Sequence, residues 1–196
     1  KVFIVISFYV LLFYLYNWGK IWSFIKTNRI IFFNFIHRES PDIICFQEYV
    51  EDYRKEFVYP DTIKKISNLK NEHVFFTYKN KDNGFGIATY TTFPIINKGE
   101  INFKSNNICI FTDIKIQSDT VRIYNCHLAS LHFQKDDYNF VDSLFKPEAE
   151  LLGGSKKIIK KLINAYERRT MQVQKISEHI QHSPYPVIVC GDFNDV

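Results

Sequence analysis

The sequence contains little glycine, with 7 residues in 196, and no Cys-x-x-Cys pair among its 4 cysteines. The scarcity of glycine argues against an array of small modules joined by flexible linkers. Cys45, Cys109, Cys126 and Cys190 each lie within an apolar, strand-like run. Without paired spacing, neither a zinc site nor a disulfide framework is favoured. We therefore predict four buried free thiols, which suits a reducing compartment.

The sequence also lacks an apolar run of the roughly 20 residues that a membrane-spanning helix requires. Its longest apolar run, Val2–Tyr16, is rich in β-branched and aromatic residues, which are typical of a buried strand. No signal-peptide cleavage pattern follows this run. We therefore predict a core strand at the start of the chain. A membrane tether at the same position stays open as an alternative, so the compartment is undecided, with the cytoplasm favoured.

A strong excess of charge of one sign is absent as well, because the formal net charge is +4. A weak positive charge is compatible with phosphate-bearing substrates, but it does not by itself identify nucleic acid as a partner. Lysine and arginine residues cluster between Lys156 and Lys175. This cluster either attracts a polyanion or forms the solvated face of an amphipathic helix, and we favour the second interpretation.

The residues that are present are typical of a packed globular domain, since 46% are hydrophobic and 17% are aromatic. Apolar residues at helical spacing predict a helix over residues 17–38, which Ser40 and Pro41 end. Residues 117–119 separate two apolar runs and predict a hairpin. Short apolar runs predict strands over 42–46, 74–78, 84–90, 108–116, 120–127 and 187–190.

The C-terminal third of the sequence predicts a long helix. Residues 130–154 are predicted to form a polar connection. Ser155 is the predicted N-cap of a helix that ends near His182. Strands interleaved with helices, together with an antiparallel hairpin, predict a layered α/β domain. The predicted apolar face of the long helix consists of Leu162, Tyr166, Val173, Ile176 and Ile180.

Reactive side chains follow three separate apolar runs of the sequence. Glu48 follows the first run, His127 the second, and Asp192 with Asn194 the third. A carboxylate such as Glu48 suits Mg²⁺, which often takes only one or two protein carboxylates and keeps several waters. Asp192 and Asn194 alternate along an extended segment, so both can face one ligand. Each residue alone has an ordinary structural explanation, but together they indicate a catalytic site.

Four segments of the sequence resemble motifs of the endonuclease/exonuclease/phosphatase superfamily. Residues 41–48, Pro-Asp-Ile-Ile-Cys-Phe-Gln-Glu, look like its metal motif PDIICLQE. Residues 125–128 resemble its NTHL motif, and residues 191–194 resemble its GDFN motif. Residues 86–95 are similar to its strand that runs from G-[IV]-A to P-I. The order and spacing of these segments also agree, and the resemblance spans essentially the whole chain.

The resemblance implies a deoxyribonuclease-like α/β (α+β) fold, a two-sheet β-sandwich flanked by helices. It implies that Glu48 binds a divalent metal ion, Mg²⁺ or Mn²⁺. By the same resemblance, Asp192 orients or deprotonates the attacking water. Asn194 hydrogen-bonds the scissile phosphate or positions Asp192, and His127 contacts the phosphate. This set suits phosphoester hydrolysis, because the anionic phosphate must be neutralised while a carboxylate activates water.

The sequence departs from the family pattern in two places. Tyr9 stands where the family's first strand usually ends in an asparagine that joins the metal site. The family's closing motifs, a further aspartate and a terminal Ser-Asp-His, would lie beyond Val196. The resemblance therefore implies that residues 1–196 are the N-terminal two-thirds of a single domain, incomplete at the C-terminus. The activity of this chain alone is in question.

Two functions remain open from the sequence. The first is a metal-dependent phosphoester hydrolase, either a nuclease or a phosphodiesterase or phosphatase, that acts as a monomer. Its substrate class, whether DNA, RNA, lipid or inositol phosphate, is undecided, because fold analogy does not choose among them. The second is a degenerate, non-catalytic domain of the same fold that acts as a binding module, which Tyr9 motivates.

Overall fold

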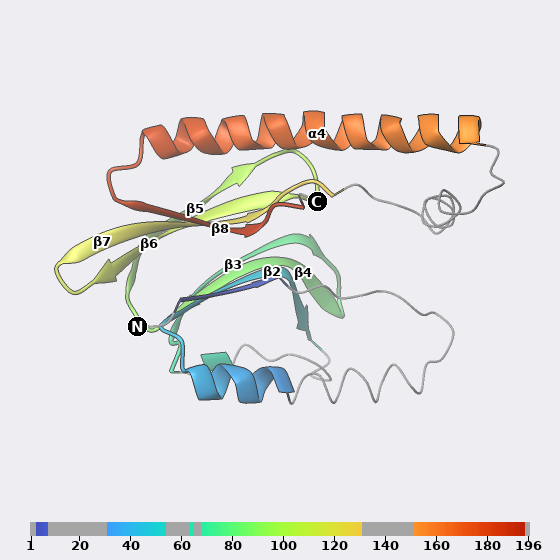
Figure 1. Cartoon of the computed structure of the whole chain (residues 1–196). Helices are drawn as coiled ribbons and strands as arrows, with labels where there is room; N and C mark the ends of the chain where they lie inside the picture. The colour runs from blue at the N-terminus through green and yellow to red at the C-terminus, as the bar shows by residue number, and fades with distance from the viewer. Residues whose placement is uncertain (1–2, 8–30, 54–62, 65–67, 131–150, 195–196) are drawn as a thin grey trace. The chain divides into compact units, whose positions relative to one another are not determined.

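The computed structural model describes residues 3–7, 31–53, 63–64, 68–130 and 151–194 (Figure 1). These residues belong to two compact units, which are described separately. The first unit lies within Lys1–His127 and Ser183–Asp192, and the second lies within Leu128–His182 and Phe193–Val196. That residues 1–196 form a single domain stays a prediction.

The first unit contains two four-stranded sheets. The first sheet has the order β1-β2-β4-β3, and the second has the order β5-β6-β7-β8. β1 is parallel to β2 and β7 is parallel to β8, whereas the other neighbours are antiparallel. The strands are β1 Phe3–Ser7, β2 Ile43–Asp52, β3 Asn71–Lys79, β4 Asn83–Thr91, β5 Ile95–Asn102, β6 Ile108–Ile116, β7 Asp119–His127 and β8 Val187–Asp192.

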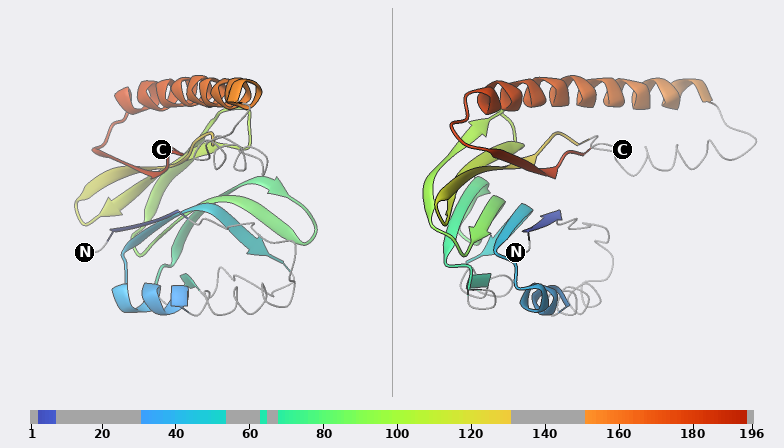
Figure 2. Two further views of the ribbon diagram at one scale, coloured as in Figure 1. Left: turned by 45° about the vertical axis from the view of Figure 1, so that its right-hand side comes forward. Right: turned by 60° about the vertical axis from the view of Figure 1, so that its left-hand side comes forward.

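The two sheets lie face to face within the first unit, and β2 contacts both β7 and β8 (Figure 2). A helix over residues 31–39 lies beside the first sheet on the side away from the second sheet (Figure 2). Ile36 of this helix packs in a cluster with Ile44 and Phe46 of β2. The expected two-sheet β-sandwich with helices is therefore confirmed.

Both faces of β2 are buried, which explains why its sequence is a continuous apolar run. Ile44 and Phe46 belong to the cluster that the helix covers. Ile43 and Cys45, which alternate with them along β2, belong to a second cluster. This cluster lies between the two sheets and also contains Ile114, Ile123 and Cys190. Because successive side chains of a strand point to opposite faces, a strand buried on both sides needs apolar residues at every position.

The helix over residues 31–39 ends at Ser40, as its sequence predicts. Ser40 has a φ of 41°, and its backbone N–H donates to Ile36 O at 2.9 Å. Its Oγ donates to His37 O at 2.8 Å. These bonds satisfy carbonyl groups in the last helical turn, and Pro41 then keeps the chain extended. Residues 17–30 of the predicted helix lie outside the described residues.

The six strands that the short apolar runs predict are present, as β2, β3, β4, β6, β7 and β8, and among the strands of the described residues only β5 was not predicted. In β5, Lys98, Gly99 and Glu100 resemble a loop in composition. The strand lies at the edge of its sheet, and the Lys98 and Glu100 side chains are exposed. Charged residues of this kind are typical of edge strands, where they discourage pairing with another chain. Composition alone therefore did not distinguish this strand from a loop.

The long helix of the second unit, α4, spans Leu151–Gln181. The prediction that Ser155 is its N-cap is wrong, because the helix begins four residues earlier. Gly153 and Gly154 lie in its first turn, where the N–H groups lack helical partners and low helix propensity has the least effect. Of the predicted connection over residues 130–154, residues 131–150 lie outside the described residues.

The predicted apolar face of α4 is partly wrong. Ile176 is buried, but Tyr166 is 48% exposed and Val173 is 51% exposed. Ala165, Arg169 and Gln172 are buried instead, at helical spacing with Ile176. Arg169 is therefore an exception to the expectation that the basic residues of this helix form a solvated face. Hydropathy did not identify this face because two of its members, Arg169 and Gln172, are polar.

Hydrogen bonds to the backbone explain why Arg169 and Gln172 are buried in the second unit. Gln172 Oε1 accepts a hydrogen bond from Ala129 N at 2.9 Å. Arg169 Nη1 donates to Ala129 O at 3.3 Å and also to Asn194 O. Backbone groups that lie outside helices and strands need such partners when they are buried. These two side chains therefore connect α4 to the segments on either side of it in the sequence.

The apolar run at the start of the chain forms a strand where it is described. β1 covers Phe3–Ser7 and is hydrogen-bonded to β2, so a strand is present there as predicted, and its place in the core stays a prediction. The rest of the run, including Tyr9, lies outside the described residues. In the part of the chain that the structure describes, no helix is both long enough and apolar enough to cross a membrane.

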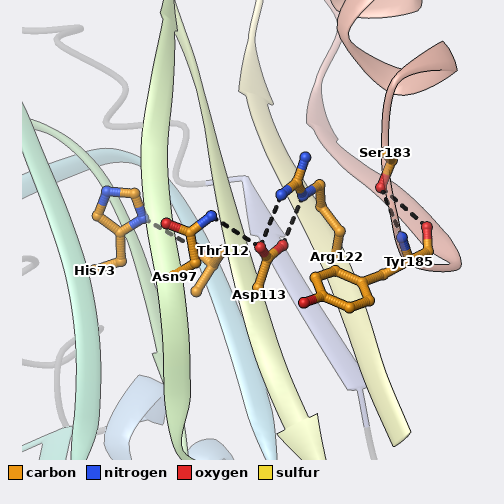
Figure 3. Close-up of polar contacts among 7 residues, drawn as sticks. All are labelled: His73, Asn97, Thr112, Asp113, Arg122, Ser183 and Tyr185. Carbon is orange, nitrogen blue, oxygen red and sulfur yellow. Dashed lines mark hydrogen bonds and ion pairs between the residues drawn. The ribbon is translucent and has the colours of Figure 1, made fainter.

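A buried ion pair joins β6 and β7 of the second sheet (Figure 3). Arg122 Nε and Nη2 donate to the two carboxylate oxygens of Asp113, at 2.6 and 2.8 Å. Asn97 Nδ2 donates to Asp113 Oδ2 at 3.0 Å, so the network joins β5, β6 and β7. The Arg122 guanidinium lies 4.5 Å from the centre of the Phe111 ring. Such a bidentate pair is stable in the interior only because each charge has its partner.

His73 of β3 is buried and hydrogen-bonded to Thr112 of β6 at 2.9 Å (Figure 3). Burial, together with the charge of Lys98, lowers the pKa of His73 to about 4. The unfolded chain takes up this proton near pH 6.5. Between these two pH values the unfolded state binds more protons than the folded state, so the free energy of unfolding falls as the pH falls.

We expect the lowered pKa of His73 to decrease the free energy of unfolding by up to about 3 kcal/mol as the pH falls from about 6.5 to 4. Urea unfolding at pH 7 and pH 4.5 measures this change. Other groups also titrate in this range, so the comparison is with a His73→Gln variant, in which residue 73 does not titrate. The variant should lose less stability over the same interval. Equal losses for the two proteins would show that His73 is not buried as a neutral side chain.

Candidate active site

The parallel pairing of β7 and β8 brings two of the predicted site residues side by side. His127 is the last residue of β7 and Asp192 is the last residue of β8, and the two are partners in the strand register. Paired residues of neighbouring strands point to the same face of the sheet. The imidazole and the carboxylate therefore lie on one face, at the carboxyl ends of two strands. Both residues are partly exposed.

Glu48 reaches the same place from the other sheet. Its Oε1 lies 4.0 Å from His127 Nε2, so the first sheet and the second sheet each supply one member of the pair. The Glu48 side chain is 43% exposed and the His127 side chain is 19% exposed. The structure thus brings together Glu48, His127 and Asp192, which are separated widely in the sequence. All three belong to the first unit.

Glu48 is positioned by a β-bulge rather than by the end of a strand, which corrects the expectation from the sequence. β2 continues to Asp52, but its pairing with β4 shifts between Phe46 and Tyr49. Gln47 and Glu48 are therefore both opposite Ile87. A bulge of this kind redirects a side chain, and bulges are frequent beside active sites.

The backbone of Glu48 is strained at this bulge. Its φ is 52°, in the left-handed region that residues with a Cβ atom rarely adopt. Strain of this kind persists only when the surrounding structure imposes it, and it is common at functional sites. The bulge therefore stabilises one orientation of a carboxylate at the expense of backbone energy.

We expect a Glu48→Gly variant to be more stable than a Glu48→Ala variant, by about 1 kcal/mol, because glycine adopts a positive φ without strain. Urea unfolding of the two variants measures the difference. The same two substitutions at Glu100, an extended and exposed position of β5, are the matched control. There the glycine variant should be the less stable one, by roughly 0.5–1 kcal/mol. The same sign at both positions would contradict the strained bulge.

A buried amide pair connects the strands that carry Glu48 and His127. Gln47 Nε2 donates to Asn125 Oδ1 at 2.6 Å, and both residues are fully buried. Asn125 Nδ2 lies within hydrogen-bonding distance of Phe46 O at 3.3 Å and Ala88 O at 3.0 Å. Asn125 thus links β7 to β2 and β4. Since buried amides need partners, this network fixes the spacing of the two sheets next to the site.

Gln47 and Asn125 were given no role from the sequence, although both lie within the motifs already noted. The sequence does contain a signal for both residues, because each is a polar amide in an otherwise apolar run. Gln47 stands immediately before Glu48, and Asn125 stands two residues before His127. A polar residue at a position that must be buried indicates an internal hydrogen bond. The sequence gives no partner for that bond, which only the fold supplies.

Gly191 allows β8 to approach β7 closely beside Asp192. It has a φ of 147°, and a Cβ atom at this position would lie 2.0 Å from Cys126 O. No side chain fits there without moving the backbone of β7. Glycine at position 191 therefore allows a close approach of the two strand backbones that a residue with a side chain would prevent.

Asn194, the fourth predicted site residue, belongs to the second unit. Its Nδ2 donates to Leu128 O at 2.8 Å, and its backbone has a φ of 51°. Its carbonyl oxygen accepts a hydrogen bond from Arg169. The side-chain amide of Asn194 is thus hydrogen-bonded to the main chain. To donate to a phosphate instead, Nδ2 would have to break its hydrogen bond with Leu128 O.

The described residues fit a divalent ion only with much of its hydration shell in place. Among residues 3–7, 31–53, 63–64, 68–130 and 151–194, no group of three or more histidine, cysteine, aspartate or glutamate side chains is arranged to hold a metal ion. Glu48 offers an exposed carboxylate. Because Mg²⁺ is often bound by one or two carboxylates and several waters, this donor set fits a hydrated Mg²⁺ or Mn²⁺ ion but not a metal enclosed by protein.

The fold and the sequence together define a member of the deoxyribonuclease-like group of α/β sandwich proteins. The chain belongs to the endonuclease/exonuclease/phosphatase family, whose family model matches residues 27–196. Members of this family generally use divalent metal ions. Among curated proteins, none matches the sequence.

Several solved structures share the fold. A humanized D. rerio TDP2 with 14 mutations has a TM-score of 0.57 and 11% sequence identity, covering 99% of this chain and 62% of that protein. The human nocturnin catalytic domain with bound sulfate has a TM-score of 0.52 and 18% identity, covering 91% of this chain and 58% of that protein.

A family protein from Leptotrichia buccalis has a TM-score of 0.50 and 13% identity, covering 92% of this chain and 62% of that protein. At these identities the likeness shows the fold and no more. The chain spans about three-fifths of the length of the D. rerio and L. buccalis proteins.

Proposed function

We propose that this chain is part of a divalent-metal-dependent phosphoester hydrolase, with the reaction taking place beside Glu48, His127 and Asp192. Membership of the endonuclease/exonuclease/phosphatase family supports hydrolysis of phosphoesters. The single observation that carries the proposal is the meeting of Glu48 and His127, with 4.0 Å between Oε1 and Nε2, at the strand ends where His127 and Asp192 are paired.

The proposed roles of these residues follow from their chemistry and position. Glu48 would hold Mg²⁺ or Mn²⁺, and the bound ion would supply positive charge that offsets the charge of the phosphate. Asp192 would accept a proton from the attacking water as a general base. His127 would donate a hydrogen bond from its imidazole to a phosphoryl oxygen, where negative charge increases in the transition state. That Asn194 hydrogen-bonds the phosphate or positions Asp192 stays a prediction from the family resemblance.

A nucleic acid is the substrate class that we propose first. One structure with the same fold is D. rerio TDP2 in complex with a single-strand DNA product, with a TM-score of 0.50 and 12% identity. In the described part of α4, the side chains of Lys160, Arg168 and Lys175 are exposed. Basic side chains of this kind favour polyanions in general, although they carry no information on sequence or on the type of nucleic acid.

The proposal is tested by hydrolysis assays on the intact protein with single-stranded DNA, single-stranded RNA and a simple chromogenic phosphodiester. We expect cleavage that requires added Mg²⁺ or Mn²⁺ and stops with a chelator. A Glu48→Gln variant should lose this activity, whereas Glu100→Gln, an acid-to-amide change at an exposed position of β5, should retain it. Absence of metal-dependent cleavage of every phosphoester tested would refute the proposal.

The second candidate is a non-catalytic binding module of the same fold, and Tyr9 is the observation that favours it. A phenol does not reproduce the hydrogen bonds of the carboxamide that the family pattern places there. A Tyr9→Asn variant distinguishes the two candidates. A large gain in metal-dependent cleavage in the variant over a silent wild-type protein would support the binding module, and unchanged high activity would exclude it.

A further inference from the structure

The four cysteines have no part in the proposed reaction, yet two of them lie directly opposite each other. Cys109 of β6 and Cys126 of β7 are partners in the antiparallel register. Their Sγ atoms lie 3.1 Å apart, and both side chains are fully buried. The two thiols point away from the first sheet, because Ile108 and Ile110 on either side of Cys109 pack with Ile87 of the first sheet.

We propose that Cys109 and Cys126 form a reversible intramolecular disulfide and are therefore a redox modification site. The register of β6 and β7 places the two residues opposite each other. The oxidant is a low-molecular-weight disulfide of the glutathione class. This inference is independent of the proposed hydrolase activity. It rests on the pairing of the two strands and on the distance between the two sulfur atoms.

The backbone geometry already meets the requirements of a disulfide. The Cα atoms of a disulfide usually lie about 4.4–6.8 Å apart. Directly opposite residues of an antiparallel pair have Cα atoms about 4.5 or 5.5 Å apart, depending on whether they are hydrogen-bonded. Both values fall within that range. The sulfur atoms need to approach by about 1 Å to reach a bond length of roughly 2.05 Å.

The proposed reaction is thiol–disulfide exchange in two steps. Because both sulfur atoms are buried in the folded protein, the reaction begins with local opening that exposes them. The thiolate of one cysteine then attacks a sulfur atom of oxidised glutathione, forming a mixed disulfide and releasing one glutathione thiolate. The second cysteine, as its thiolate, attacks the protein sulfur of the mixed disulfide and releases the second glutathione thiolate. Two cysteine thiols and one oxidised glutathione thus give one protein disulfide and two reduced glutathione molecules, and the protein loses two hydrogen atoms.

The environment of the pair implies slow exchange. A hydrogen bond with the Cys126 thiol and burial raise the pKa of the Cys109 thiol. The thiolate is the reactive form, so its scarcity limits the rate and not the equilibrium. The other two cysteines provide an internal comparison. Cys45 and Cys190 are also neighbours, since a hydrogen bond with Cys190 is the largest cause that raises the pKa of the Cys45 thiol. They lie in different sheets, however, and no strand register aligns them.

Peptide mapping tests the proposal in the intact protein. The protein is equilibrated in buffers of increasing ratio of oxidised to reduced glutathione, free thiols are alkylated, and the chain is digested with trypsin. Each of the four cysteines falls in a different tryptic peptide: 39–54, 105–115, 123–135 and 176–196. We expect a linked pair of peptides 105–115 and 123–135 that appears as the ratio rises and disappears when reduced glutathione is restored.

The thermal stability of the oxidised and the reduced protein is measured alongside the peptide mapping. The disulfide closes a loop across the β6–β7 hairpin and restricts the unfolded chain, so the oxidised protein should unfold at a Tm several degrees higher than the reduced protein. Cys109→Ser and Cys126→Ser should each abolish both the linked peptides and the rise in Tm, whereas Cys45→Ser should retain both. Three results would overturn the proposal: no protein disulfide at the most oxidising ratio, only mixed disulfides with glutathione, or a linkage that joins Cys45 to Cys190 instead.

Discussion

An Asp192→Asn variant of the intact protein is expected to lower kcat by about 10²–10⁴-fold, because general-base catalysis contributes a factor of this size. Asparagine has nearly the shape of aspartate but does not accept a proton from water. KM should change little, since the substrate contacts remain. Steady-state kinetics with the best phosphoester substrate measure both constants. The expected split between kcat and KM distinguishes a lost base from a lost binding contact.

The matched control for this prediction is Asp119→Asn. Asp119 is the first residue of β7, is exposed, and lies at the opposite end of that strand from His127. The control variant should retain the wild-type kcat. A loss of activity in the control would show that the amide substitution acts through the sheet as a whole. An unchanged kcat in the Asp192 variant would contradict the role proposed for Asp192.

An Asp113→Ala variant is expected to lose about 3–5 kcal/mol of folding free energy, the usual cost of breaking a buried ion pair. The Arg122 side chain is 8% exposed and the Asp113 side chain is 1% exposed, so the remaining guanidinium would be buried without its anion. An arginine guanidinium keeps its proton in proteins, so Arg122 would stay charged after its anion is removed. Urea or thermal unfolding measures the loss.

A double variant, Asp113→Leu with Arg122→Met, tests whether the loss comes from the unpaired charge. Replacing both members of a buried ion pair by apolar residues of similar volume is often nearly neutral. The double variant should therefore be more stable than Asp113→Ala. If the double variant is as unstable as the single variant, packing and not charge determines the contribution of this pair.

Much of the sandwich could be predicted from the sequence because its inner strands have a simple pattern. Strands buried on both faces, such as β2, form short apolar runs, and turn residues such as those over 117–119 mark the hairpin between β6 and β7. The edge strand β5 could not be predicted in the same way. Its Lys98, Gly99 and Glu100 are suited to a protected edge, and this composition is also that of a loop.

The residues of the candidate site were predicted from the sequence, whereas their arrangement in space was not. Glu48, His127 and Asp192 were identified because acids and an imidazole follow apolar runs in a motif order. The bulge that turns Glu48 toward His127 was not predicted, since a positive φ at a glutamate is set by the pairing of β2 with β4 and not by local preference. The same holds for the Gln47–Asn125 hydrogen bond, which joins two sheets.

Long-range polar contacts were the other source of error. Arg169 of α4 carries a charge and was assigned to the solvated face, yet it is buried and hydrogen-bonded to main-chain carbonyl groups. Helical periodicity identifies a buried face only when that face is apolar. A basic residue that satisfies the backbone of a loop has the same sequence signature as one that faces solvent.

The claim that Glu48 and His127 meet at a divalent-metal site is tested most directly by Mn²⁺ titration of the intact protein observed by NMR. Mn²⁺ broadens the signals of nuclei near it. The signals of Glu48, His127 and Asp192 should therefore disappear first. The signals of Gln117 and Ser118, in the turn before β7, should persist, because the two ends of β7, Asp119 and His127, are about 26 Å apart by the rise of a strand. The broadening at the site should be lost in Glu48→Gln. Broadening that is uniform along β7, or unchanged in Glu48→Gln, would contradict a metal site at Glu48.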